Sequence, residues 1–249
     1  MVVQVRVLKQ IKPNFKILIC GMPGTGYVGK LAVDYLVKEL KAELVAEIYS
    51  DSFPPVVIIK RDGVAELIKG EIYSCQDPST KQNLLIFTGR TQPVTAEGEY
   101  EVADAVLEFA KKANVNLVYS MGAYILGSFV KNPQVHGTAI SKNLLAGLRK
   151  HNVLVMKEGS IIGMNGLLFA LSQLKKMQGI CLLGETSGYV VDAKASEAVL
   201  GVLNQLLGLN VDMTALREKG KETEDFIKKL EENNRKTGSS KGSSVGYIS

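Results

Sequence analysis

Residues 15–49 read FKILICGMPGTGYVGKLAVDYLVKELKAELVAEIY, and this stretch decides the fold class. An apolar run at Phe15–Cys20 predicts a strand that leads into a glycine-rich loop. The next segment, Tyr27–Leu40, places apolar residues at spacings of three and four, which is typical of an amphipathic helix. Leu44–Tyr49 then reads as another strand. A strand, a loop, a helix and a strand in succession predict an α/β fold.

The same alternation of strands and helices continues to about residue 210. After Pro54–Pro55, two β-rich runs flank Asp62–Gly63, which is a strong hairpin signal and predicts an antiparallel excursion from the sheet. Elsewhere the alternation predicts a mostly parallel sheet with helices on both faces. The further expected strands are Val2–Leu8, Asn83–Thr88, Val115–Ser120, Val153–Met156 and Gly179–Leu183, and the further expected helices are Ala96–Ala113, Ser141–Lys150, Asn165–Met177 and Ala193–Leu207.

The chain changes character after the α/β domain, which we place at residues 1–211. Residues 212–236 carry acidic residues four positions before basic ones, which favours a charged helix. Its narrow apolar seam either docks on its own domain or faces another subunit. Residues 237–249 begin with TGSSKGSS and read as a flexible tail. The seam residues expected to contact a partner are Leu216, Ile227 and Leu230.

Composition excludes several classes of protein. The net charge of +5 comes from 30 basic and 25 acidic residues that are intermixed, and Trp is absent, so we expect no nucleic-acid binding. We expect no membrane span and no secretory signal, and therefore a cytoplasmic protein, because long apolar runs are absent. Cys20, Cys75 and Cys181 lie far apart, which argues against a disulfide framework and a zinc site.

The glycine-rich loop half-matches two nucleotide-binding signatures. It fits GxGxxG, with Glu47 near the position of a ribose-binding carboxylate, but three extra residues displace the tight turn. It also fits the start of GxxxxGK[ST], but Leu31 stands where a hydroxyl would bind Mg²⁺. Either the loop holds an anion through its backbone amides or the glycines serve close packing, and we expect no nucleotide and no cofactor. The candidate anion loop comprises Gly21, Gly24, Gly26, Gly29 and Lys30.

Catalytic signatures are weak elsewhere. The histidines are His136 and His151, and His136 lies in QVHGTAIS, which we interpret as a loop leading into a helix. It could pair with a nucleophile such as Ser120, Ser141 or Cys75, but no GxSxG motif supports this. We therefore predict no catalytic residue, no metal ligand and no enzyme activity.

Three stretches together resemble the proteasome assembly chaperone family, second type, and its archaeal members in particular. They are GMPGTGYVGKLAVDYL at 21–36, YSMGAY at 119–124 and GSIIGMNGLLFALSQLKKMQGICLLGETSGY at 159–189. The resemblance covers about residues 1–210. It implies a three-layer α/β/α fold similar to nucleoside phosphorylases without their catalytic equipment, and residues 212–236 add the C-terminal helix that their charge spacing predicts. It also implies an ATP-independent, non-catalytic assembly factor.

The resemblance also suggests partners. Relatives hold proteasome α-subunits during ring formation, and archaeal relatives tend to form homo-oligomers. Some end in a hydrophobic-Tyr-any tripeptide that inserts between α-subunits, whereas here Tyr247 is third from the end and follows Gly246. We expect the tail to be a recognition peptide through Val245, Tyr247 and Ile248, although a tail with incidental apolar residues is the alternative.

Three classes of function stay open at this point. The first is an assembly chaperone that binds itself and proteasome α-subunits or other cytosolic proteins. The second is a ring-shaped scaffold that recruits other cytosolic proteins through its C-terminal arms. The third is a phosphate- or nucleoside-binding enzyme of phosphorylase-like fold, which would use the glycine-rich loop.

Overall fold

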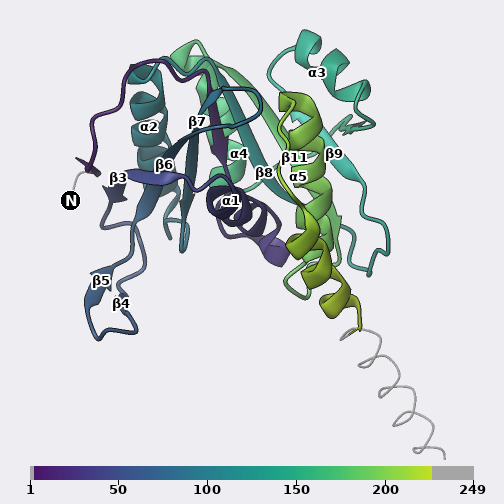
Figure 1. Cartoon of the computed structure of the whole chain (residues 1–249), viewed down its shortest axis with the longest axis horizontal. Helices are drawn as coiled ribbons and strands as arrows, with labels where there is room; N and C mark the ends of the chain where they lie inside the picture. Colours follow the sequence, from purple (N-terminus) through teal and green to yellow (C-terminus); the bar gives the residue numbers. More distant parts are fainter. Residues whose placement is uncertain (1–2, 226–249) are drawn as a thin grey trace, which may run out of the picture.

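The structure, a computed structural model, describes residues 3–225 and places nine strands in one mixed sheet with helices on both faces (Figure 1). The strand order is β1-β3-β6-β7-β2-β8-β11-β9-β10. The predicted α/β fold with a mixed sheet is confirmed. The strands are β1 (Gln4–Val7), β2 (Ile17–Cys20), β3 (Glu43–Tyr49), β6 (Gly70–Gln76), β7 (Asn83–Gly89), β8 (Leu117–Ile125), β9 (Val135–Ala139), β10 (Leu154–Val155) and β11 (Gln178–Thr186).

The helices form two outer layers around this sheet. Successive residues of a strand point to opposite faces, so β2 supplies Ile17 and Ile19 to one core and Leu18 and Cys20 to the other. Helices α1, α3 and α5 pack on the first face, and α2 and α4 on the second. Their bounds are α1 (Val28–Glu39), α2 (Ala96–Lys112), α3 (Lys142–Arg149), α4 (Met164–Leu171) and α5 (Ala193–Leu207), with short 3₁₀ turns at Thr25–Tyr27 and Ser172–Lys175.

Strand direction differs between the centre and the flanks of the sheet. The central strands β7, β2, β8 and β11 are parallel to one another, and β9 is parallel to β10. The pairs β1–β3, β3–β6, β6–β7 and β9–β11 are antiparallel. The sheet is mixed as expected, but parallel pairs do not outnumber antiparallel pairs in it. A strand buried on both faces has the same apolar pattern in either direction, so the sequence did not reveal this.

The predicted hairpin is confirmed as a separate two-stranded sheet of β4 (Val57–Ile59) and β5 (Ala65–Leu67). Gly63 turns the chain at a φ of 81°, and its amide donates to the Lys60 carbonyl at 2.9 Å. Figure 1 shows the hairpin projecting away from the helices and the main sheet.

Two boundaries differ from the sequence expectation. Residues 135–139 form β9, which pairs with β11, and not a loop leading into a helix. The predicted helix 165–177 ends at Leu171, and Lys176 adopts a left-handed conformation at φ 62°. Thr95 is confirmed as the N-cap of α2, because its side chain accepts a hydrogen bond from the Gly98 amide at 3.1 Å.

The chain continues beyond α5 as a second helical stretch. Gly208 ends α5 in the left-handed conformation, and residues 214–225 are again helical. In the span from residue 3 to residue 225, no helix is both long and apolar enough to cross a membrane.

Candidate functional site

The glycine-rich loop between β2 and α1 is shaped by close packing. A Cβ atom on Gly29 would lie 2.0 Å from the Met121 carbonyl oxygen of β8, and one on Gly21 would lie 2.2 Å from the Gly29 carbonyl oxygen. Gly26 has a φ of 63°, a conformation that favours glycine. The spacing of these glycines therefore follows from the contact of α1 with the sheet, whether or not the loop also binds an anion.

Two residues that the nucleotide signatures single out lie away from the loop. Lys30 forms an ion pair with Asp34 one turn later in α1, and it lines a cavity of about 500 Å³ with Glu71 and Arg90. Glu47 lies on β3, which β6 and β7 separate from β2. A dinucleotide site needs the carboxylate on the strand next to the glycine-rich turn. Glu47 therefore does not lie where a ribose-binding carboxylate would lie. The anion loop stays a prediction, and Lys30 lines a different cavity from Gly24.

A cavity of about 750 Å³ lies at the carboxyl edge of the parallel strands, and we call it the carboxyl-edge cavity. Open α/β sheets characteristically bind ligands at this edge. Gln92 and Asn165 brace it by hydrogen bonding to the glycine-rich loop and to the start of α4. The side-chain oxygen of Gln92 accepts a hydrogen bond from the Met164 backbone amide at 2.7 Å, and the side-chain NH₂ group of Gln92 donates to the Pro23 carbonyl. The Asn165 side chain accepts from the Met22 amide at 3.0 Å.

The Glu99 carboxyl group of this cavity takes no part in those hydrogen bonds. Glu99, in the first turn of α2, lines the cavity, and burial raises the pKa of its carboxyl group above the usual range. Glu158 and Tyr124 also line it. Sequence reasoning missed Glu99, because a glutamate in the first turn of a helix looks like ordinary dipole stabilisation.

His136 is held in a fixed arrangement without a nucleophile. Its Nε2 lies 2.9 Å from the Glu185 carboxylate, and its ring stacks on Tyr124 with centroids 3.8 Å apart. The Glu185 carboxylate also accepts from the Gln134 amide at 3.0 Å. Burial by itself would raise the pKa of Glu185, but these hydrogen bonds lower it overall. In the described part of the chain His136 makes no contact of this kind with Ser120, Ser141 or Cys75.

The three cysteines show no sign of reactivity. Cys20 and Cys181 are fully buried, and Cys75 is half-buried. Burial raises the thiol pKa values of Cys75 and Cys181 to about 12. Thiolates are the reactive form, so these thiols are inert near neutral pH. Among the residues that the structure describes, no cluster of three His, Cys, Asp or Glu side chains is arranged to hold a metal ion.

The β4–β5 hairpin presents an exposed apolar surface, the hairpin face, formed by Val57, Ile59, Ala65 and Leu67. These residues pair across the two strands, Val57 with Leu67 and Ile59 with Ala65. The side chains of Val57, Ile59 and Leu67 are 51%, 65% and 60% exposed. The sequence contained this signal, because apolar residues at alternate positions on both sides of Asp62–Gly63 form one face of a hairpin. Contiguous exposed apolar surface commonly marks a site of protein–protein contact.

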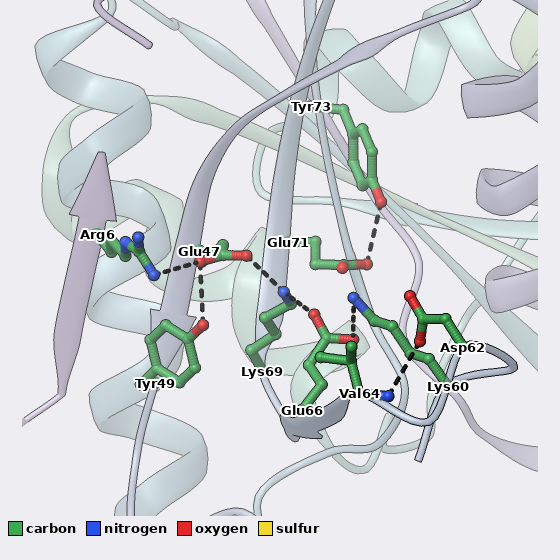
Figure 2. A network of polar contacts seen from close by, with 10 residues as sticks. All are labelled: Arg6, Glu47, Tyr49, Lys60, Asp62, Val64, Glu66, Lys69, Glu71 and Tyr73. Carbon is green, nitrogen blue, oxygen red and sulfur yellow. Dashed lines mark hydrogen bonds and ion pairs between the residues drawn. The ribbon is translucent and has the colours of Figure 1, made fainter. Parts of the chain in front are cut away.

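An ionic network, buried at Glu47 and Lys69 and exposed at its ends, joins the hairpin to the main sheet (Figure 2). The Lys69 ammonium group bonds to both Glu47 of β3 and Glu66 of β5. Arg6 Nη1 lies 3.7 Å from the Glu47 carboxylate, and Lys60 Nζ lies 3.2 Å from that of Glu66. Figure 2 shows the side chains of Arg6, Glu47, Lys69, Glu66 and Lys60 pointing toward one another. The hairpin therefore has a charged and largely buried base beneath an apolar face.

The network shifts the pKa values of its members. Burial would raise the pKa of Glu47, but hydrogen bonds from Lys69 and Tyr49 lower it overall. The hydrogen bond from Lys69 is the main cause that lowers the pKa of Glu66. Burial would lower the pKa of Lys69, but its bonds to both glutamates raise it. All three groups are therefore charged at neutral pH.

A second exposed apolar surface lies on the end of β8 and the loops after β8 and β11, and we call it the aromatic loop patch. It comprises Ile125, Leu126, Phe129, Tyr189 and Val191, of which Tyr189 is 74% exposed. The rings of Phe129 and Tyr189 meet edge to face with centroids 6.4 Å apart. This arrangement brings residues far apart in sequence together on one surface.

The C-terminal prediction is corrected at its one described residue. Leu216 is 1% exposed and belongs to the core formed by α1 and α5, so it docks on its own domain and is not available to a partner. Tyr35 of α1 reinforces this docking by donating from its hydroxyl group to the Asp212 carbonyl at 2.7 Å. The other predicted partner-binding residues lie outside the described residues: Ile227, Leu230, Val245, Tyr247 and Ile248.

Comparison with known proteins relates the chain to one family. The model of the PAC2 family matches residues 18–231. An uncharacterised protein of Methanocaldococcus jannaschii is 34% identical over 227 residues, which is 90% of this chain and 87% of that protein.

Two solved structures are also similar. The Pyrococcus furiosus protein PbaB, described as an archaeal proteasome activator, matches at a TM-score of 0.86 and 38% identity, over 92% of this chain and 99% of PbaB. The P. furiosus protein PbaA, described as an archaeal homolog of proteasome-assembly chaperone, matches at a TM-score of 0.78 and 28% identity, over 96% of both chains.

Proposed function

This chain belongs to the PAC2 family, and on that premise we propose that it is a non-catalytic, ATP-independent factor that binds proteasome α-subunits. The observation that carries the proposal is the similarity to PbaB over nearly the whole length of both chains. PbaA, described as a homolog of an assembly chaperone, supports the same partner. The partner is inferred from these relatives, and the surfaces of this chain supply the physical means.

The arrangement of reactive groups supports a binding role. His136 is engaged by Glu185 and Tyr124, and the thiols of Cys20 and Cys181 are buried with raised pKa values. The hairpin face and the aromatic loop patch, by contrast, leave large apolar side chains in water. Burial of such side chains against a partner is favourable by about 25 cal/mol per Å² of apolar surface. These surfaces favour association with protein.

Two modes of action on the proteasome are candidates. Assembly is the first, in which the protein holds α-subunits while the ring forms. Activation of the complete proteasome is the second, and the higher identity to PbaB than to PbaA favours it. A scaffold that recruits other cytosolic proteins would instead leave α-subunits unbound.

We also propose that the protein is a homo-oligomer. Closed symmetry is the usual form of soluble oligomers, and the hairpin face offers exposed apolar surface for such contacts. In this proposal residues 1–211 form the oligomeric body, and residues 237–249 present Val245, Tyr247 and Ile248 to the partner. Several tails engaged together would strengthen binding that is weak for a single tail.

The test uses the full-length protein, a truncation after Lys236 and the Tyr247→Ala variant. Light scattering measures the mass, and a monomer near 27.0 kDa at micromolar concentration contradicts the oligomer. Binding is measured to isolated α-subunits and to complete 20S proteasomes of the source organism. Faster ring formation supports assembly, and faster peptide hydrolysis by complete 20S proteasomes supports activation. Failure of the full-length protein to bind either one contradicts the proposed partner.

The two variants test the tail separately from the body. If both variants keep full affinity for α-subunits, the tail is not the contact. The hairpin face then becomes the surface to mutate. If both lose binding but keep the oligomeric mass of the full-length protein, the tail is the contact and the body serves only to array it.

A further inference from the structure

The carboxyl-edge cavity has an unusual charge for this chain. The protein is basic overall, with 30 Lys and Arg residues, yet within the described residues no Lys, Arg or His side chain lines this cavity. Two glutamates do line it, Glu99 from α2 and Glu158 from the loop before α4. A volume of about 750 Å³ lies within the usual range for small-molecule sites, about 300–1,000 Å³.

Glu99 lacks a partner for its charge. It makes no hydrogen bond or ion pair with another described side chain, and burial is the cause that raises its pKa. The nearby amides of Gln92 and Asn165 do not satisfy it, because they bond to the backbone at Pro23, Met22 and Met164. A partly buried carboxylate without a partner is unfavourable, and a positively charged group placed beside it removes that cost.

The walls of the cavity indicate the rest of the ligand. Tyr124 lines the cavity while its ring stacks on His136, which fixes the orientation of the ring. Ile125 and Ile162 lie at the same cavity and are 59% and 91% exposed. Aromatic rings attract cations, and aliphatic walls favour an apolar body next to the charge.

We propose that the carboxyl-edge cavity binds a small organic cation, with an ammonium or guanidinium group against Glu99 and an apolar body against Tyr124 and Ile125. The ligand enters where the parallel strands end, beside Gly24 and Thr25 of the glycine-rich loop. An anion is disfavoured here because both charged side chains lining the cavity are acidic and Lys30 lies in a different cavity. This inference is independent of proteasome binding and holds or fails separately from it.

The experiment uses calorimetric titration of the full-length protein at pH 7.5 and low salt. The probes are butylguanidinium and its neutral isostere butylurea, with tyramine as a second cation that carries a ring. We expect butylguanidinium and tyramine to bind saturably at one site per chain, and butylurea to give only heat of dilution. Equal binding of butylguanidinium and butylurea overturns the proposal, and so does the absence of saturable binding by either cation.

Two matched variants locate the site. Glu99→Gln keeps the shape of the side chain and removes its charge, and it should weaken binding of both cations about tenfold to a hundredfold. Glu97→Gln is the control, because Glu97 lies in the same first turn of α2 but outside the cavity, and it should leave the affinity within about twofold. The Glu99 carboxylate has no partner to lose, so its variant should fold. Unchanged affinity in Glu99→Gln overturns the assignment.

The same cation chemistry has two sources, a free metabolite or a basic side chain of a bound protein. The blocked peptide acetyl-Ala-Arg-Ala-amide distinguishes them. Binding of the peptide as tight as that of butylguanidinium, with the same loss in Glu99→Gln, assigns the cavity to an arginine side chain. Binding of the free cations alone assigns it to a small molecule.

Discussion

The glycine-rich loop at residues 21–29 and the β4–β5 hairpin are opposites in how they meet the rest of the protein. In the loop, backbone touches backbone so closely that a single Cβ atom on Gly29 would lie 2.0 Å from the Met121 carbonyl oxygen. In the hairpin, Gly63 has nothing within 4 Å of a built Cβ, and the apolar side chains of the hairpin face lie in water.

The difference shows which kind of sequence signal points to function. The loop has a pattern that looks like nucleotide binding, yet close packing explains Gly21 and Gly29, and a positive φ explains Gly26. The hairpin looks like an ordinary turn, yet it leaves the large apolar side chains of Val57, Ile59 and Leu67 exposed to water. An isolated two-stranded sheet is marginally stable in water. The ionic network at Lys69 therefore anchors the hairpin to the main sheet, whereas the glycine-rich loop is held by its own close packing.

The largest expected effect comes from breaking the packing of the loop. Gly29→Ala should lower the free energy of unfolding by roughly 4–5 kcal/mol or more, because backbone atoms on both sides must shift. Chemical denaturation measures it. Gly147→Ala is the control, since Gly147 lies within α3 with nothing near its Cβ, and it should stabilise by about 0.4–1 kcal/mol. A loss of less than about 1 kcal/mol in Gly29→Ala would refute the close-packing account.

Removing Lys69 from the centre of the ionic network should have the next largest effect on stability. Lys69→Ala leaves Glu47 and Glu66 charged and largely buried without their shared partner, and it should cost about 3–5 kcal/mol. Urea denaturation measures the loss. The triple variant Lys69→Met, Glu47→Gln, Glu66→Gln removes all three charges together and should recover most of the stability. If the single and triple variants are equally destabilised, the charges are not the cause.

Low pH should weaken the same ionic network. The pKa values of Glu47 and Glu66 are lower in the folded protein than in the unfolded chain, so the unfolded chain binds more protons as the pH falls. Their contribution is complete above the ordinary glutamate pKa of about 4.3 and is lost as the pH falls through the folded values. Hydrogen exchange between pH 6 and pH 3 should show the hairpin amides losing protection before those of β2. A pH dependence that is unchanged in the triple variant contradicts this assignment.

The smallest effect on stability should come from the hairpin face itself. Ile59→Thr and Leu67→Thr replace exposed side chains, so each should change the free energy of unfolding by less than about 0.5 kcal/mol. If the face binds another copy of the chain, the double variant should form a smaller oligomer, with a lower mass in light scattering. If the face binds a partner, the double variant should have a lower affinity for α-subunits. Retention of both would show that the face is not an interface.

Much of the fold could be predicted, because periodicity identifies elements that carry a clear apolar pattern. Helix α5 was predicted with the bounds that the structure shows, and the cap at Thr95 and the turn at Asp62–Gly63 followed from local chemistry. Strand β9 could not be predicted from VHGTA, because its pairing with β11 is a tertiary contact. The directions of β1, β3 and β6 depend on connections that period-2 patterns do not encode.

The candidate sites were harder to predict for a different reason. The carboxyl-edge cavity assembles Glu99, Tyr124 and Glu158, which no short motif connects. Leu216 was assigned to a partner because its seam is narrow, but α1 and α5 cover it. Sequence spacing shows which residues share a face of a helix, and only the three-dimensional structure shows what covers that face.

The position of β2 at the centre of the sheet affects how the protein is made. Its neighbours are distant in the chain, since Ile17 pairs with Leu84 on one side and with Leu117 on the other. During synthesis the segment Ile17–Cys20, which is apolar at every position, leaves the ribosome before β8 does. Its second edge stays unpaired until β8 has been made. Non-local pairing of this kind slows folding, and the waiting segment is exposed to aggregation. Refolding should therefore be slow and sensitive to protein concentration.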